Sequence, residues 1–343
     1  MSRSTRRRLR ILVLMQPELI PPDSVEGMSE RDLYEIKTEY DVLRTLRAQG
    51  HDVRALGVRY ELLPIREAVE EWKPHVVFNL LEDFFGLREF DHHVVSYLEL
   101  LRVPYTGCNP RGLVLSRDKA LSKKVLAYHR LALPRFDVVR RGRRVRRSRL
   151  LTFPLIVKSL NEEGSVGIAQ ASVVNSDAEL TARVEFVHRS IESDAIIEEY
   201  IDGREIYIGI VGNDRLAVFP PWELFFEKPA PGARLIATSR VKHNLLHQER
   251  RGIFQGPAEL SDELRHKLVS NARRIYRLLS LDGYARLDFR LRADGTPFFI
   301  EANPNPEVAE SEEFASSALE AGIAYSELLA RIVSLGVRRG RKG

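Results

Sequence analysis

The sequence predicts an α/β fold, with a parallel sheet in the N-terminal part and an α+β arrangement in the C-terminal part. Over the first hundred residues, short apolar runs alternate with helical patterns, as in parallel sheets with crossover helices. Later, Asp294-Gly295 separates two runs that alternate apolar and polar residues, which favours an antiparallel hairpin. At 343 residues, the chain is too long for one compact core and suits two or three domains.

The N-terminal part is expected to contain three strands and three helices. Gly50 ends the first helix, and Pro74 precedes the third strand. The expected strands cover residues 9–15, 51–58 and 76–80, and the expected helices cover residues 30–49, 65–72 and 91–101. Because ligands of parallel sheets gather beyond the carboxyl ends of the strands, residues 16–26 and 81–86 are expected to lie near a site.

The rest of the chain is expected to mix helices with short strands. We interpret Ser116 as the N-cap of a helix that ends near His129. Further helices are expected at 176–190, 259–279 and 312–335, and strands at 134–139, 153–158, 195–201, 206–211 and 216–219. The segment 220–257 is rich in proline, glycine and charge, and it is expected to be irregular.

The hairpin near the C-terminus brings four polar residues together. If Asp294-Gly295 forms a two-residue type I′ loop, Asp288 lies opposite Glu301 and Arg286 lies opposite Asn303. All four side chains then share one face, because residues two apart on a strand point the same way. Opposed carboxylates repel, so a cation is expected between them, and Mg²⁺ accepts such oxygen ligands. A solvated polar face with an ordinary arginine–carboxylate pair is the alternative.

Composition and charge argue against several classes of protein. No apolar run approaches the ~20 residues that span a bilayer, so no membrane segment is expected. The single cysteine, Cys108, excludes a disulfide framework, and a reducing, cytoplasmic location is the default. The formal charge is +5, with basic tails at 1–7 and 337–343 and seven arginines in segment 140–149. That segment contains no aromatic residue for base stacking, so we expect a solvated loop there and no nucleic-acid partner.

A lysine and a glycine loop follow one another in the middle of the chain. Lys158 ends an apolar run and therefore needs a counter-charge. The sequence Gly164-Ser165-Val166-Gly167 follows, and glycines let backbone N–H groups approach a phosphate closely. The P-loop pattern and the dinucleotide-binding fingerprint are both absent. Together, the lysine and the glycine loop predict a phosphate-binding site that differs from both of these patterns.

The order of these motifs resembles the ATP-grasp superfamily and, within it, the D-alanine–D-alanine ligases. The similarity extends over nearly the whole chain and includes 322–328 near its end. It rests on the following motifs in this order: Asp118-Lys119, Val157-Lys158, Gly164-Ser165-Val166-Gly167, Glu198-Glu199-Tyr200-Ile201, Glu205, Arg286-Leu287-Asp288 and Glu301-Ala302-Asn303. The resemblance implies an ATP-grasp fold of three subdomains: an N-terminal substrate domain at 8–115, a central lid at 116–201 and a catalytic domain at 202–336.

The resemblance also implies a role for each matching residue, with ATP and Mg²⁺ as cofactors. The residues implied to bind ATP are Lys119 and Lys158 at the phosphates, Gly164, Ser165, Val166 and Gly167 in the closing loop, Glu198 at the adenine amino group, the backbone of Tyr200 and Ile201 at the adenine edge, and Glu205 at the ribose. Asp288, Glu301 and Asn303 are implied to ligate one or two Mg²⁺ ions, with Mn²⁺ as a substitute. The implied catalytic residues are Arg286, Lys242 and Ser165.

The activity implied by the resemblance is that of an ATP-dependent carboxylate–amine ligase. A substrate carboxylate attacks the γ-phosphate, which gives an acyl phosphate and ADP; an amine then attacks the acyl carbon and phosphate leaves. Small carboxylate and amine substrates are expected as partners, and the family is compatible with a homodimer. A catalytically inactive ATP-binding regulator is the alternative, and the intact set of polar residues argues against it.

Two segments depart from the family pattern and predict a substrate other than D-alanine. D-alanine ligases carry a histidine after the third strand, whereas residues 79–86 here contain none. Their N-terminal glutamate aligns near Leu33, with Glu35 only a neighbour. After Asn303, residues 304–313 include four glutamates in place of the family's serine-containing segment. These glutamates either favour a cationic or carboxylate-free amine or cap the last helix.

Overall fold

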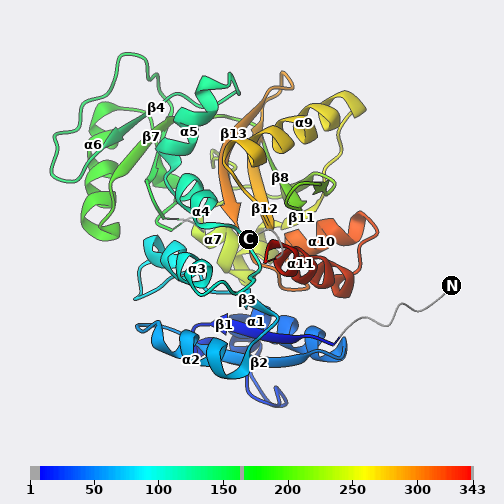
Figure 1. The fold of residues 1–343 in the computed structure, drawn as a ribbon. Coiled ribbons are helices and arrows are strands. Elements are labelled where there is room, and N and C mark those ends of the chain that lie inside the picture. Colours follow the sequence, from blue (N-terminus) through cyan, green and yellow to red (C-terminus); the bar gives the residue numbers. More distant parts are fainter. Residues whose placement is uncertain (1–7, 163–165, 341–343) are drawn as a thin grey trace.

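The structure is a computed structural model that describes residues 8–162 and 166–340. It contains three β-sheets, each with its own covering helices. Figure 1 shows the N-terminal sheet as a separate layer below the other two. Among the described residues, no helix combines the length and apolarity needed to cross a bilayer.

The N-terminal sheet is parallel, as predicted, with the strand order β2-β1-β3. Its strands are β1 (Arg10–Met15), β2 (Asp52–Gly57) and β3 (Val76–Asn79), and its helices are α1 (Glu30–Ala48), α2 (Leu63–Trp72) and α3 (Asp91–Leu100). The hydroxyl of Ser29 accepts a hydrogen bond from Asp32 N and so caps α1. The expected order of elements in this part is confirmed, with ends that differ by one or two residues.

The helix predicted from Ser116 is wrong, because two helices meet there. α4 (Pro110–Arg117) is capped by Asn109 and already contains Ser116. α5 (Lys119–Tyr128) is capped by Asp118, whose Oδ1 accepts from the N–H groups of Ala120 and Leu121 at 2.9 and 2.8 Å. The break lies at Asp118 because its extended backbone and its carboxylate satisfy the first turn of α5.

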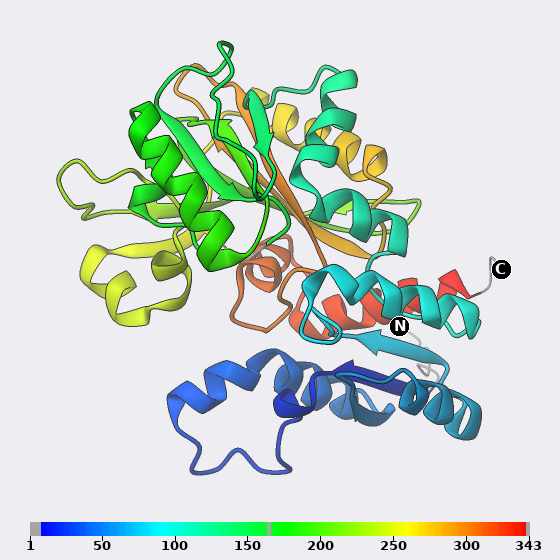
Figure 2. The ribbon, with the colours of Figure 1, turned by 90° about the vertical axis from the view of Figure 1, so that its left-hand side faces the viewer.

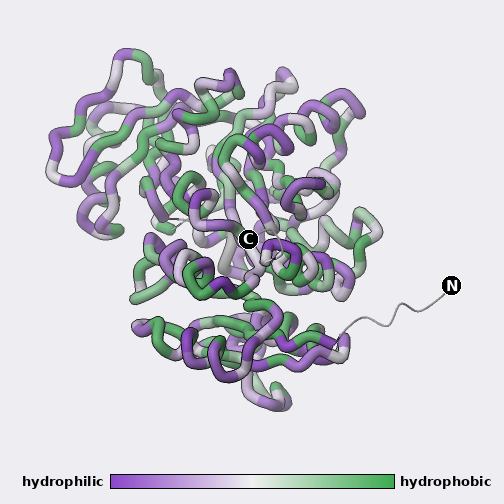
Figure 3. The backbone as a smooth tube through the Cα atoms, viewed as in Figure 1, coloured by the Kyte–Doolittle hydropathy of each residue, from purple (hydrophilic) through white to green (hydrophobic). Residues whose placement is uncertain are grey.

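The middle sheet is antiparallel and has the order β4-β7-β5-β6. Its elements are β4 (Phe136–Val139), β5 (Leu155–Ser159), β6 (Val173–Val174), β7 (Ala195–Glu199) and α6 (Asp177–Phe186), which a π-helical turn at Val187–Ile191 extends. One face packs against α6 through apolar residues that include Val157 and Ile197. Figure 3 shows the arginine-rich segment 140–149 within a hydrophilic loop at the outer edge of this sheet.

The third sheet is antiparallel, with the order β11-β10-β8-β12-β13 and β9 beside β8. Its strands are β8 (Arg204–Val211), β9 (Ala217–Val218), β10 (Trp222–Phe226), β11 (Ile253–Pro257), β12 (Tyr284–Leu291) and β13 (Pro297–Pro304). α9 (Asp262–Leu278) contributes Leu268, Ala272 and Ile275 to a hydrophobic core that also contains apolar residues of β8 and β12. Three short 3₁₀ turns lie elsewhere in the chain, at Pro17–Leu19, Arg88–Phe90 and Gln170–Ser172.

The prediction that 220–257 is irregular is wrong. This segment contains β10, β11 and two short helices, α7 (Ser239–His243) and α8 (Leu245–Arg251). β11 is an edge strand, a place that tolerates its Gly256 and Pro257. Its pairing with β10, which runs from Trp222↔Pro257 to Phe226↔Ile253, is a long-range contact that local composition does not reveal.

The single final helix predicted at 312–335 is also two helices, α10 (Glu313–Glu320) and α11 (Tyr325–Arg339). They are separated at Gly322, whose φ of 76° suits the residue that follows a helix C-terminus. α11 packs its Leu328, Leu329 and Ile332 into the core that contains β1 and β3. Figure 2 shows this helix between the N-terminal sheet and the rest of the molecule.

The β12–β13 hairpin has the predicted pairing but a different loop. Gly295 N donates to Arg292 O at 2.9 Å and Arg292 N donates to Thr296 O at 3.1 Å, which makes a three-residue loop. The predicted two-residue loop is therefore wrong by one residue. A register shift between Asp288 and Phe289 compensates for it, so Asp288 still lies opposite Glu301 and Arg286 opposite Asn303.

Candidate active site

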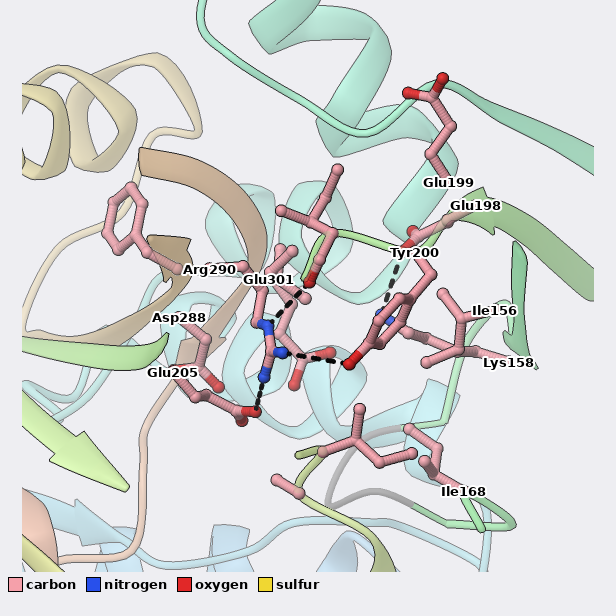
Figure 4. A pocket seen from close by; sticks show the side chains of 15 residues that line it. Ile156, Lys158, Ile168, Glu198, Glu199, Tyr200, Glu205, Asp288, Arg290 and Glu301 are labelled. Carbon is pink, nitrogen blue, oxygen red and sulfur yellow. Dashed lines mark hydrogen bonds and ion pairs between the residues drawn. The ribbon is translucent and has the colours of Figure 1, made fainter. Parts of the chain in front are cut away.

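A pocket lies between the middle sheet and the third sheet, lined from β5, β7, β12 and β13 (Figure 4). Part of its wall is apolar and the rest is charged, which suits a ligand with a flat apolar part and an anionic part. The apolar side chains in the wall are Ile156, Ile168, Ile201, Ile236, Phe289 and Ile300. The charged ones include Lys158, Glu198, Glu205, Asp288, Arg290 and Glu301.

Lys158 and Glu198 reach this pocket because strand residues alternate between faces. Val157 and Ile197 point towards α6, so Lys158 and Glu198 point the other way, on paired strands. Lys158 Nζ donates to Glu198 Oε2 at 3.0 Å, and both side chains are buried. The counter-charge expected for Lys158 is thus Glu198, the residue that the family resemblance assigns to the adenine.

A second lysine, Lys123, completes this cluster, and the sequence analysis missed it. Lys123 is fully buried, and its Nζ lies 3.0 Å from Glu198 Oε1. Burial acts to raise the pKa of Glu198, but Lys123 and Lys158 outweigh it and bring that pKa to about 2. The spacing of four residues between Lys119 and Lys123 was the available signal, since it places both lysines on one face of a helix.

Lys119 lies at the other side of the pocket, next to the glycine loop. Its Nζ donates to the carbonyl of Glu162 and lies 4.0 Å from Glu301 Oε2. α5 therefore directs one lysine to the loop and one to Glu198. Gly164 and Ser165 lie outside the described residues. Gly167 has a φ of 68°, and a Cβ there would lie 1.9 Å from Ile191 Cδ1, so only glycine fits.

The hairpin brings Asp288, Asn303 and Arg286 into direct contact. Asn303 Nδ2 donates to Asp288 Oδ2 at 3.0 Å, and Arg286 Nε donates to Asp288 Oδ1 at 2.8 Å. Arg286 also pairs with Glu313, on α10, and its guanidinium lies 4.9 Å from the centre of the Tyr207 ring. Asp288 and Glu301 form one polar edge of the pocket, and Asn303 extends this edge towards the neighbouring cavity that it lines.

The donor set at this edge fits a magnesium ion. Among the described residues, no group of three or more histidines, cysteines, aspartates or glutamates is arranged to hold a metal. Two carboxylates and an amide are nevertheless what Mg²⁺ accepts, because it keeps water and phosphate oxygens in its other positions. Since Asn303 uses its Nδ2 on Asp288, its Oδ1 is the atom left for an ion.

Glu205, assigned to the ribose by resemblance, is already hydrogen-bonded within the protein. Its Oε2 accepts from Arg290 Nη1 at 3.0 Å and its Oε1 accepts from Tyr207 at 2.9 Å. A ribose hydroxyl would have to share these oxygens, which a carboxylate allows. Arg290 was missed, although it follows Arg286 and Asp288 at the two-residue spacing of one strand face.

The backbone atoms expected at an adenine edge are partly used as well. Tyr200 N donates to Pro154 O at 3.1 Å, and Ile201 O accepts from Arg290 Nε at 3.1 Å. The carbonyl of Tyr200 and the N–H of Ile201 are therefore the backbone groups that a ligand could contact there. Lys242 lies in α7, where the structure describes only its backbone.

Two further cavities, of ≈ 260 and ≈ 390 Å³, adjoin the other end of the hairpin. The first is lined by Arg286, Asn303 and Val166, and it shares a wall that includes Glu82 and Glu307 with the second. Segments 79–86 and 304–313, which depart from the family pattern, thus both line the cavities at this end of the hairpin.

The glutamates of segment 304–313 divide between two settings. Glu307, Glu312 and Glu313 line the ≈ 260 Å³ cavity, and the last two also begin α10, so both interpretations of these residues apply. Glu310 instead pairs with Arg44 at 2.8 Å.

Comparisons with known proteins agree with this geometry. The family described as D-ala D-ala ligase C-terminus matches residues 125–334. A D-alanine–D-alanine ligase of Bordetella petrii is 32% identical over 69% of each chain. An uncharacterized protein of Sinorhizobium fredii, y4sG, is 34% identical over 77% of this chain and 75% of its own. The crystal structure of Bacillus anthracis D-alanine–D-alanine ligase complexed with ATP has a TM-score of 0.74 and 25% identity, covering 97% of this chain and 99% of that one.

Proposed function

Because this chain belongs to the D-alanine–D-alanine ligase family of ATP-dependent ligases that form C–N bonds, we propose that it joins a small carboxylate to an amine through an acyl phosphate, and that its substrate is not D-alanine. One observation carries this proposal. The β12–β13 hairpin presents Asp288, Glu301 and Asn303 between the pocket that holds the Lys158–Glu198 pair and the cavity that holds Arg286.

In this proposal, the pocket between the sheets takes ATP. The apolar wall takes the adenine, and the end where Lys119 approaches Glu301 takes the phosphates. Lys123 and Lys158 share one carboxylate, which leaves one positive charge to attract a polyphosphate. Mg²⁺, or Mn²⁺ in its place, supplies charge neutralisation when one or two ions are bound at Asp288, Glu301 and Asn303. The unit 116–201 acts as the lid over 202–336, with 162–168 excluding water.

The chemistry has two steps. A substrate carboxylate oxygen bonds to the γ-phosphorus of ATP as the bond to the β-phosphate oxygen breaks, and ADP leaves. The amine nitrogen then bonds to the acyl carbon, phosphate departs with the electron pair, and the amine loses one proton. Arg286 is held by Asp288 and Glu313 beside the cavity, where its guanidinium stabilises the oxyanion of the tetrahedral intermediate.

The cavity wall supports a substrate other than D-alanine. Five acidic side chains line this cavity, Glu82, Glu307 and Glu312 among them, against three arginines. This excess of negative charge would repel a free carboxylate on the amine substrate, although Lys37 pairs with Glu307 and Glu312. The segments that carry these glutamates are the two that depart from the family pattern.

The test is ADP release with a panel of carboxylates and amines, with hydroxylamine added to trap an acyl phosphate as a hydroxamate. We expect ADP and phosphate in equal amounts only when both substrates are present. Glu301→Gln should lower kcat/KM about 100-fold or more, whereas Glu320→Gln, at an exposed position of α10, should not change it. Fastest turnover on D-alanine alone would contradict the substrate part, and ATP binding without ADP release on any pair would favour the inactive relative.

A further inference from the structure

A buried glutamate lines the ≈ 390 Å³ cavity on the side away from the hairpin. Glu39 lies on α1, between residues that pack the N-terminal core, and only 5% of its surface is exposed. The cavity is large enough for a small-molecule ligand. It shares with the Arg286 cavity a wall that contains Glu82 and Glu307.

Glu39 has no basic partner among residues 8–162 and 166–340. The nearest lysine on its helix, Lys37, is committed to Glu312 and, at 3.1 Å, to Glu307. Burial raises the pKa of Glu39 to about 7, and the charges of Glu82 and Glu307 act in the same direction, against a hydrogen bond to its own backbone. Lys37 and Arg88 also line this cavity, but their ion pairs among the described residues are with other glutamates. Ionising Glu39 at this buried position is therefore unfavourable, and a ligand that brings a cation would offset that cost.

We infer that one substrate carries a primary ammonium group distal to its reacting group, and that this ammonium binds Glu39. This inference rests on the proposed function. The substrate extends from Arg286, where the bond forms, past Glu82 and Glu307 to Glu39. A compact ammonium suits this end because its three N–H donors can serve three carboxylates at once. The distal group belongs either to the amine, which is then a diamine, or to the carboxylate, which is then an ω-amino acid.

The experiment compares matched substrates at pH 8, where Glu39 is ionised. Diaminoalkanes are compared with alkylamines of equal length, and ω-amino acids with the corresponding alkyl carboxylates, in ADP release and by calorimetric titration of the ATP-bound protein. The wild-type protein should prefer the ammonium-bearing member of one pair about tenfold or more. Glu39→Gln should abolish this preference by raising KM with little change in kcat, and Glu39→Asp should retain part of it.

The control is Glu67→Gln on α2, an exposed position, which should keep the wild-type preference. Thermal unfolding checks that Glu39→Gln folds; we expect it to be at least as stable as the wild type, because it removes an unpaired buried acid. An equal preference in Glu39→Gln and wild type, in turnover or in calorimetric binding, overturns the inference while the ligase activity stands. Absence of ADP release on every pair overturns the proposed function, and the titrations still decide whether Glu39 binds the ammonium.

Discussion

At the scale of single residues, Glu198 is the most constrained group of the site. It is a fully buried carboxylate between two buried lysines, and each lysine comes from a different element, α5 and β5. Such a cluster is held together by mutual attraction in a medium that solvates charge poorly. It also fixes the position of Lys158, whose ammonium the proposed function assigns to the phosphates.

Replacing Lys123 should therefore destabilise the whole protein. We expect Lys123→Met to lower the free energy of unfolding by about 3 kcal/mol, because Glu198 loses one of two ion partners at a fully buried site. Lys124→Met, at the next and exposed position of α5, is the matched control and should change stability little. Urea denaturation measures both. Equal stability of the two variants would mean that Glu198 is satisfied by Lys158 alone.

At the scale of elements, α5 depends on its first turn. The helix begins at Lys119, directly after Asp118, which accepts hydrogen bonds from two of the otherwise unpaired N–H groups there. Lys119 and Lys123 both project from this helix towards the pocket proposed to take ATP, so the cap sets the direction of both ammonium groups. The hairpin β12–β13 shows the same dependence on local geometry, since one shift of register compensates for one extra loop residue.

Removing the cap should have a measurable effect that removing the neighbouring serine lacks. Asp118→Ala should lower the free energy of unfolding by about 1 kcal/mol and weaken ATP binding, because α5 loses its capping carboxylate. Ser116→Ala should be near neutral, because Ser116 lies inside α4 and its hydroxyl has no hydrogen-bond partner among the described residues. Chemical denaturation and ATP titration compare the two. A larger loss for Ser116→Ala would contradict the observed helix boundary.

At the scale of the whole molecule, the last helix joins the N-terminal sheet to the β12–β13 hairpin. Arg339, at the end of α11, donates to Gly107 O at 2.8 Å and pairs with Asp282 at 2.6 Å, two residues before β12 begins. Its guanidinium also lies 4.1 Å from the centre of the Tyr105 ring. One side chain thus connects three segments that are distant in the sequence.

Truncating the Arg339 side chain should weaken the contact of α11 with the segment at Gly107 and with Asp282. Arg339→Ala is expected to lower the free energy of unfolding by about 1–3 kcal/mol, since it removes charge-assisted hydrogen bonds at a half-buried site. Arg338→Ala is the control, because Arg338 is exposed and donates its side-chain hydrogen bonds to Ser334, on its own helix. Thermal and urea unfolding measure both. Similar stability of the two variants would contradict a joining role for Arg339.

Local sequence patterns predicted the order of most elements. They also predicted the pairing of Asp288 with Glu301, although the predicted loop is one residue too short and a register shift compensates for it. They could do so because alternation along a strand and capping of a helix are local effects, fixed by sterics within a few residues. The parallel N-terminal sheet, the shared face of β12 and the place of segment 81–86 beyond a strand end followed from the sequence pattern.

The partners of the buried charges depend on tertiary packing and could not be predicted from local patterns. That Glu198 holds two lysines, that Arg290 occupies Glu205 and that Glu39 faces a cavity depend on which distant segment packs opposite each residue. The strands β10 and β11 are of the same kind, because they exist through pairing across the sheet. Burial and pairing are properties of the assembled chain, since the energy of a charge depends on everything around it and not on its neighbours in sequence.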